Sequence, residues 1–239
     1  MIRTQSFSDV DSCIDAMLSA VGKHIVLGIP LGIGKPNGFV NALYRRACAD
    51  PSLRLEIFTA LTPSVPVGRS LLESRFLGPI VERLYRDFEP LDYATAVRAK
   101  TLPPNVSVAE FYFSPGSWLG SDYAQQNYTS ENYSRVTRAL IDRGVNAIAQ
   151  AVARKTSDGE TRFSLGSNPD LTLDLVSEWG SKKRPYLIGQ VSAAMPFMPN
   201  DAETAPEFWD AIIDAPTERS ALFAVPMRLA AASGMNAGQ

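Results

Sequence analysis

The sequence predicts an α/β fold: an open, mostly parallel sheet with helices on both faces and a small hairpin beside it. Short apolar segments alternate with amphipathic ones, which is the pattern of such folds. Residues 24–60 contain a strand, a helix and a strand in succession, which predicts a right-handed parallel crossover. The chain has 239 residues, of which 45% are hydrophobic and 20% charged. This is ordinary globular composition, and the length suits one large domain or two small ones.

The first half of the chain contains the predicted crossover. Apolar residues recur at helical spacing in residues 7–21, and Ser6 or Ser8 can cap that helix. The elements expected next are a strand over 24–30, a helix over 38–49, a strand over 53–60, a helical region over 70–88 interrupted at Gly78 and Pro79, and a strand over 108–113.

The second half adds the hairpin and the remaining strands. A helix is expected over 135–143, with Gly144 as the residue that follows its end. The elements after it are a strand over 145–153, a turn over 156–160, a return strand over 162–165, a helix over 169–177, a strand over 185–192, and short elements over 208–214 and 222–226.

The composition argues against several classes of function. The net charge is −2 and the basic residues are dispersed, so no nucleic-acid partner is expected. No apolar run reaches the ~18 residues of a membrane span, and the N-terminus lacks the apolar core of a secretory signal. Cys13 and Cys48 lie far apart, so we expect reduced thiols in a cytoplasmic protein.

The inventory of catalytic residue types is also restrictive. His24 is the only histidine, and at the start of an apolar strand it is expected to be held by hydrogen bonds rather than to catalyse. Without a second histidine or a cysteine cluster, a zinc site is not expected. The sequence has no GxSxG motif, which removes the commonest architecture of serine hydrolases.

The most informative segment is a glycine-rich loop between a strand and a helix, HIVLGIPLGIGKPNGFVNAL. Its candidate binding residues are Gly32, Gly34, Pro36, Asn37 and Gly38. In this layout backbone N–H groups can point at a ligand, and glycine permits close approach. The spacing fits neither the Walker A loop nor the dinucleotide fingerprint. The loop alone therefore leaves two interpretations open, a ligand site or a tight turn at the start of a helix.

Ligands of open parallel sheets bind outside the carboxyl ends of the strands. Three loops are expected at those ends, over residues 31–38, 62–68 and 193–199. Residues 164–168 and the hairpin loop can join them. A site built from these loops is the expectation for this fold.

Segments in a fixed order extend this interpretation. The glycine loop is followed by VNAIAQAV and FSLGSNPDLTLDLV, and then by IGQVSAAMPFMPNDAE and FWDAIID. The set resembles the N-terminal domain of the acetyl-CoA hydrolase/CoA-transferase family, the class I coenzyme A transferases. The resemblance spans about residues 24–226. Many members carry Asn after the Val that precedes the MP loop, whereas here the shorter Ser192 follows Val191.

The resemblance implies two related α/β domains with the active site between them. A glutamate attacks an acyl-CoA thioester and forms a glutamyl-CoA thioester, which is passed to a carboxylic acid or to water. Backbone N–H groups of glycine loops suit the developing oxyanion. In the family the glutamate belongs to the C-terminal domain, and no segment here matches its motif. The resemblance thus implies that residues 1–239 form a single N-terminal domain, half of an enzyme, with no catalytic residue and no activity alone.

The implied partners follow from this chemistry. Acyl-CoA and carboxylic acids are substrates, no separate cofactor is expected, and the C-terminal domain is the protein partner. Ser192, Met195 and Pro196 join the glycine loop as candidate binding residues. We expect residues 195–198 to form an exposed apolar face, covered by that domain or by a homodimer. A non-catalytic coenzyme A- or nucleotide-binding module remains an alternative, and a nicotinamide oxidoreductase is disfavoured by the glycine spacing.

Overall fold

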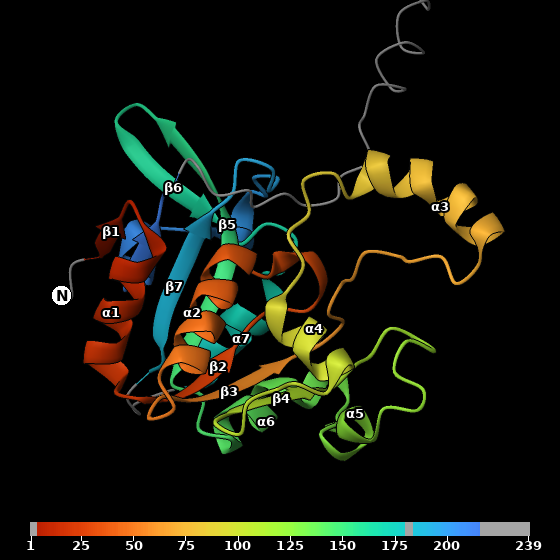
Figure 1. Ribbon diagram of the computed structural model, residues 1–239. Coiled ribbons are helices and arrows are strands. Elements are labelled where there is room, and N and C mark those ends of the chain that lie inside the picture. Colours follow the sequence, from red (N-terminus) through yellow and green to blue (C-terminus); the bar gives the residue numbers. More distant parts are fainter. Residues whose placement is uncertain (1–3, 180–183, 216–239) are drawn as a thin grey trace, which may run out of the picture.

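The computed structural model describes residues 4–179 and 184–215. It contains a nine-stranded sheet with the strand order β1-β9-β7-β5-β2-β3-β4, and every pair along this path is parallel (Figure 1). In that order the strands are β1 (Gln5–Phe7), β9 (Ala211–Ile213), β7 (Tyr186–Val191), β5 (Ala147–Ser157), β2 (His24–Gly28), β3 (Arg54–Thr59) and β4 (Val106–Glu110). The predicted α/β fold and the parallel β2–β3 crossover are confirmed.

The predicted hairpin is also present. The second half of β5 pairs antiparallel with β6 (Glu160–Ser164), and β6 pairs with β8 (Glu203–Thr204). The turn between β5 and β6 places Asp158 at φ 53° and Gly159 at φ 81°. Two successive residues in the left-handed region suit the twist of a two-residue hairpin.

Helices cover both faces of the sheet. One face carries α1 (Val10–Val21), α2 (Asn37–Ala49) and α4 (Asp92–Ala99), and the other carries α6 (Val136–Asp142) and α7 (Asp170–Glu178). Helix α2 buries Phe39, Val40 and Leu43 at helical spacing. Each such side chain contributes about 1.5–3 kcal/mol when it leaves water. The shorter elements are η1 (Gly32–Gly34), α5 (Asp122–Gln126), η2 (Tyr133–Arg135), η3 (Asn200–Ala202) and η4 (Pro206–Phe208).

The start of the chain differs from the sequence prediction. The first helix begins at Val10, and Asp9 caps it by accepting a hydrogen bond from the Ser12 N–H at 2.8 Å. Ser6 and Ser8 are not the cap, and Phe7 belongs to the edge strand β1. The physical reason is tertiary, because residues 5–7 find a parallel partner in β9 at the far end of the sequence. The predicted element over 222–226 lies outside the described residues.

Helix α3 (Leu71–Leu84) also corrects a prediction. The helix runs through Gly78 and Pro79 without interruption. None of its residues is buried, so water can hydrate the backbone carbonyl that Pro79 leaves without an N–H partner. Ser70 caps it by accepting a hydrogen bond from the Glu73 N–H at 3.1 Å. Figure 1 shows α3 standing off from the layered body of the domain.

We expect substitutions on α3 to leave stability nearly unchanged. Leu72 and Phe76 are 80% and 71% exposed, so Leu72→Glu and Phe76→Glu should each change the free energy of unfolding by less than about 0.5 kcal/mol. Phe39→Ala on α2 is the contrast, because this fully buried side chain should cost about 3–5 kcal/mol. Urea denaturation of the three variants checks this, and a large loss in the α3 variants would contradict the exposed position of the helix.

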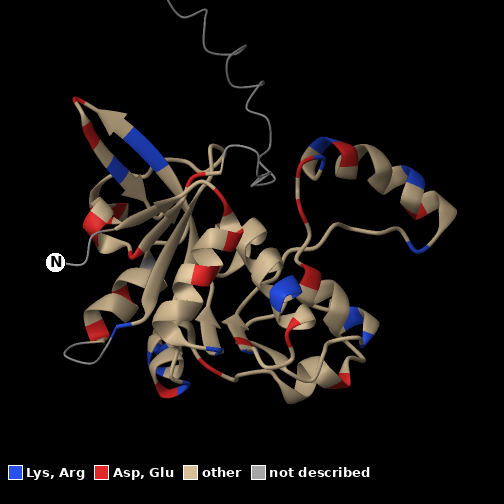
Figure 2. Cartoon of the chain, turned by 60° about the vertical axis from the view of Figure 1, so that its left-hand side comes forward, with Lys and Arg blue, Asp and Glu red and all other residues tan. Residues whose placement is uncertain are grey.

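In the part of the chain that the structure describes, charged residues of both signs are mixed. Figure 2 shows acidic and basic positions intermingled over the helices and the hairpin. Arg46 of α2, for example, pairs with Asp11 and Asp15 of α1. Among the described residues, no helix has the length and apolar character needed to cross a membrane.

Candidate functional site

The sheet has a topological switch point between β2 and β5. From β2 the sheet continues through β3 and β4 on one side, and β5, β7 and β9 extend it on the other. Loops that leave the carboxyl ends of the strands diverge at such a point and open a crevice. A cleft of roughly 640 Å³ is found at this edge. Its walls are formed by residues 31–33, residues 61–64, Pro66, Tyr85, Ser114, Ser167 and Asn168.

The expected loops are only partly represented in this cleft. Residues from the loops over 31–38 and 62–68 line it, and residues 167 and 168 join them from the segment between β6 and α7. The loop over 193–199 contributes no lining residue to the described cleft. The glycine loop is thus one wall of a cavity, in addition to being the turn that starts α2.

Gly32 and Gly34 are needed for different physical reasons. Gly32 has φ 63°, a region that glycine adopts without strain, and its N–H donates to the carbonyls of Ala60 and Leu61 at 3.4 and 3.2 Å. That N–H is therefore engaged within the protein. Gly34 is buried, and a Cβ added there would overlap with the side-chain amide of Asn168. Gly34 thus permits the close approach of Asn168 to the loop.

Lys35 fastens the glycine loop to the end of β3. Its side chain is 4% exposed, and Nζ donates to the carbonyl oxygens of Pro30 and Ala60 at 2.6 Å each. One carbonyl belongs to the glycine loop and the other follows β3, so the amine bridges two walls of the cleft. Burial lowers the pKa of Lys35 to about 7, and the charge of Glu110 opposes this shift. A neutral amine retains two N–H groups, which match the two acceptors.

A second buried network fastens the β3 loop to β4. The Thr62 hydroxyl donates to Glu110 Oε1 at 2.7 Å, and the Thr62 N–H donates to Oε2 at 3.4 Å. The Tyr93 hydroxyl of α4 lies 2.9 Å from Thr62 Oγ1. Burial raises the pKa of Glu110, against the opposing charge of Lys35 and the Thr62 hydrogen bonds. The buried polar groups around the cleft therefore hold its walls in place.

The remaining glycine-loop candidates form the start of α2. Pro36 immediately precedes the helix and Asn37 is its first residue. The Asn37 amide donates to the Glu89 carbonyl at 2.6 Å, so it ties α2 to the segment before α4. Gly38 lies in the same first turn, and the Phe39 N–H donates to Gln190 Oε1 at 3.0 Å. These contacts assign structural roles to the helix start, and a ligand role for Pro36, Asn37 and Gly38 stays a prediction.

The residues after β7 depart from the expected exposed apolar face. Ser192 and Met195 are 2% and 5% exposed, and Met195 packs against Ala151 and Ala153 of β5. Pro196 is exposed, and Phe197 is half-buried against the same cluster. The expectation of a continuous apolar surface over 195–198 is therefore wrong, because the loop folds back onto the long strand β5. For this loop, the binding roles expected of Ser192, Met195 and Pro196 stay predictions.

Sequence reasoning missed the residues that shape the segment between β6 and α7. Gln150 is fully buried in β5, and its Nε2 donates to the carbonyls of Leu165 and Asn168 at 2.9 and 2.8 Å. Its Oε1 accepts a hydrogen bond from the Thr172 hydroxyl at 2.6 Å. A polar residue inside the otherwise apolar run AIAQAVA, residues 147–153, was the available signal. Gln150 thereby positions Asn168 against Gly34.

The described lining residues of the cleft include no aspartate, glutamate, histidine, cysteine or lysine side chain. Its polar side chains are hydroxyls and one amide, and Glu110 and Lys35 are buried behind them. Among the described residues no group of histidine, cysteine, aspartate or glutamate side chains could hold a metal ion. This wall of the cleft is therefore suited to holding a neutral polar or apolar group.

Comparison with known proteins identifies the fold. No protein-family model matches the chain, and no curated protein matches it in sequence. Its structure is similar to RipA from Yersinia pestis, with a TM-score of 0.51 and 16% identity over 86% of this chain and 43% of RipA. A RipA variant gives a TM-score of 0.54 at the same identity and coverage. A 4-hydroxybutyrate CoA-transferase from Porphyromonas gingivalis matches 87% of this chain and 38% of its own at 14% identity, and its TM-score of 0.44 is too low to support an argument.

The chain therefore shares the open, mostly parallel α/β fold of the matched part of RipA, and the α/β class predicted from the sequence is confirmed. The chain spans less than half the length of the RipA chains that it matches. At 16% identity the likeness establishes the arrangement of the chain, and the activity has to be argued from the site.

Proposed function

We propose that this chain binds an acyl-CoA thioester and forms the N-terminal domain of an acyl-CoA hydrolase or CoA-transferase that acts through a glutamyl-CoA thioester. The observation that carries the proposal is the glycine loop, which lines a 640 Å³ cleft at the switch point of a parallel sheet, in a chain whose ordered segments resemble those of the CoA-transferase family. Coenzyme A thioesters and carboxylic acids are then the substrates, and no further cofactor takes part.

The chemistry of the cleft supports a division of labour between two domains. Acyl transfer through a covalent intermediate needs a carboxylate that reaches the thioester carbonyl. The described lining of the cleft supplies none, and the buried Glu110 is engaged by Thr62. A nucleophilic glutamate on a second, C-terminal domain would complete the site, and this chain would hold and orient the acyl-CoA. The candidate binding residues are Gly32, which lines the cleft with its neighbours, and Gly34 of the same loop.

We expect the 239-residue chain to bind acetyl-CoA without consuming it. Isothermal titration calorimetry measures binding, and a thiol reagent measures release of free coenzyme A from acetyl-CoA or succinyl-CoA. Binding without thiol release agrees with the proposal. Thiol release by pure protein would place the nucleophile in this chain and contradict the assignment of the glutamate to another domain. Absence of binding would remove the proposed acyl-CoA site itself.

A further inference from the structure

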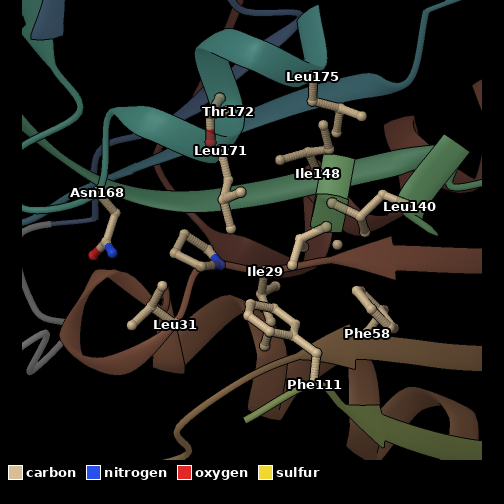
Figure 3. A pocket seen from close by; sticks show the side chains of 13 residues that line it. Ile29, Leu31, Phe58, Phe111, Leu140, Ile148, Asn168, Leu171, Thr172 and Leu175 are labelled. Carbon is tan, nitrogen blue, oxygen red and sulfur yellow. The ribbon is translucent and has the colours of Figure 1, made fainter. Parts of the chain in front are cut away.

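A second, smaller pocket lies beside the cleft. It has a volume of about 30 Å³ and is lined almost entirely by apolar side chains from β3, β5, α6 and α7. Figure 3 shows Leu171 and Leu175 of α7 on one side of it, and Phe58 and Phe111 on the other. Two polar side chains reach its wall: the Thr172 hydroxyl donates to Gln150, and Asn168 Oδ1 accepts from Ser167. The lining of the pocket is therefore mainly apolar.

The pocket and the cleft share two lining residues, Leu31 of the glycine loop and Asn168. Figure 3 shows these two side chains together at one end of the pocket. A ligand held in the cleft can therefore extend an apolar end past Leu31 and Asn168 into the pocket. Gly34 sets the position of Asn168, so the glycine loop and the entrance to the pocket are built as one unit.

We propose that this pocket is the acyl-chain subsite of the chain and that it selects short, unbranched acyl groups of two or three carbons. The inference rests on the proposed function, since the cleft would hold the thioester. The pocket, at about 30 Å³, is far smaller than the 640 Å³ cleft, so it has room for a short acyl group only. The apolar walls favour methyl and methylene groups, and a charged acyl terminus would be buried without a partner.

The test is the dependence of affinity on acyl length. Calorimetric titration of the 239-residue chain with coenzyme A, acetyl-CoA, propionyl-CoA and hexanoyl-CoA should show about a four-fold gain per buried carbon, ending at propionyl. Leu171→Phe fills the pocket from its half-buried rim, and this variant should bind acyl-CoA no better than coenzyme A. Leu171→Ala should move the preference toward longer chains, which tests the pocket with a substitution that cannot overpack it.

Leu173→Phe is the matched control, because Leu173 is also half-buried on α7 and does not line the pocket. It should keep the length preference of the wild type. Equal affinity for coenzyme A and all acyl-CoAs would overturn the subsite and leave the proposed function standing. Failure of every coenzyme A compound to bind would overturn both. An unchanged length preference in Leu171→Phe would place the acyl group elsewhere.

Discussion

Lys35→Met is expected to lower the free energy of unfolding by about 2–3 kcal/mol. The substitution removes two short hydrogen bonds inside the protein, to the carbonyls of Pro30 and Ala60, and leaving a buried polar group without its partner costs about 1–3 kcal/mol. Two effects keep the loss below the sum of two such costs. Pro30 keeps the Thr59 hydroxyl and Ala60 keeps the Gly32 N–H as partners, and the variant no longer buries an amine.

Lys23→Met is the matched control for this measurement. Lys23 also has two partners, Asp50 and Ser52, but its side chain is 62% exposed. Exposed pairs of this kind contribute little to stability, so the control should denature almost as the wild type does. Equal denaturant midpoints for Lys35→Met and the wild type would show that the amine does not hold the glycine loop.

The stability of the wild type and that of Lys35→Met should also depend differently on pH. Burial lowers the pKa of Lys35 from 10.5 to about 7, so between these values the unfolded chain binds more protons than the folded one. Stability then rises with pH over this window, and the full penalty of burying the charge is present below pH 7. The stability advantage of the wild type over Lys35→Met should therefore grow from pH 7 to pH 9.5.

The titration of Glu110 changes stability with pH in the opposite direction, so its contribution has to be removed from the measurement. Burial raises its pKa, so its contribution to stability falls as pH rises above the ordinary value of 4.5. Denaturation of wild type and Lys35→Met in a Glu110→Gln background removes that contribution. A stability difference that stays flat between pH 7 and 9.5 in this background would mean that Lys35 keeps its ordinary titration in the folded protein.

Local sequence pattern was sufficient for the elements around the site. The apolar run that becomes β2, the helical spacing of Phe39, Val40 and Leu43, and the single helix between two strands together predicted a parallel crossover with a loop at its carboxyl edge. These features depend on neighbours within a few residues or on the handedness of one crossover. The position of the glycine loop in the fold could therefore be inferred from residues 24–60.

The contacts that complete the site join residues far apart in the chain. Lys35 reaches a carbonyl 25 residues away and Thr62 reaches Glu110 across 48 residues, and neither spacing has a periodic signature. The local sequence around Lys35 therefore did not predict that its amine joins the carbonyls of Pro30 and Ala60. The loop that contains Met195 was expected at the surface because it is apolar. In the structure Met195 instead packs against the small residues Ala151 and Ala153 of β5.

Gly34→Ala is expected to lower the free energy of unfolding by about 1–3 kcal/mol, the usual cost of overpacking. The backbone at Gly34 does not require glycine, since its φ lies outside the positive range. The cost arises because the new Cβ overlaps with the amide oxygen of Asn168 and lies 2.8 Å from its Cγ. Asn168 must then move away from the entrance of the proposed acyl-chain subsite. The variant should therefore also lose the preference for short acyl chains among acyl-CoAs.

A double-mutant cycle with Asn168→Ala tests this cause. Truncating Asn168 removes the overlapping atoms and leaves only its Cβ, 3.2 Å from the new methyl group, so Gly34→Ala should cost much less in that background, with a coupling of about 0.5–3 kcal/mol. Gly32→Ala is the contrast. At φ 63° its cost of about 1–2 kcal/mol is backbone strain, and the nearest atom, Leu61 Cδ2, lies 4.0 Å from the added Cβ. Asn168→Ala should not relieve it. If Asn168→Ala relieves both glycine substitutions equally, or neither, the close packing of Asn168 on Gly34 is not what requires glycine at this position.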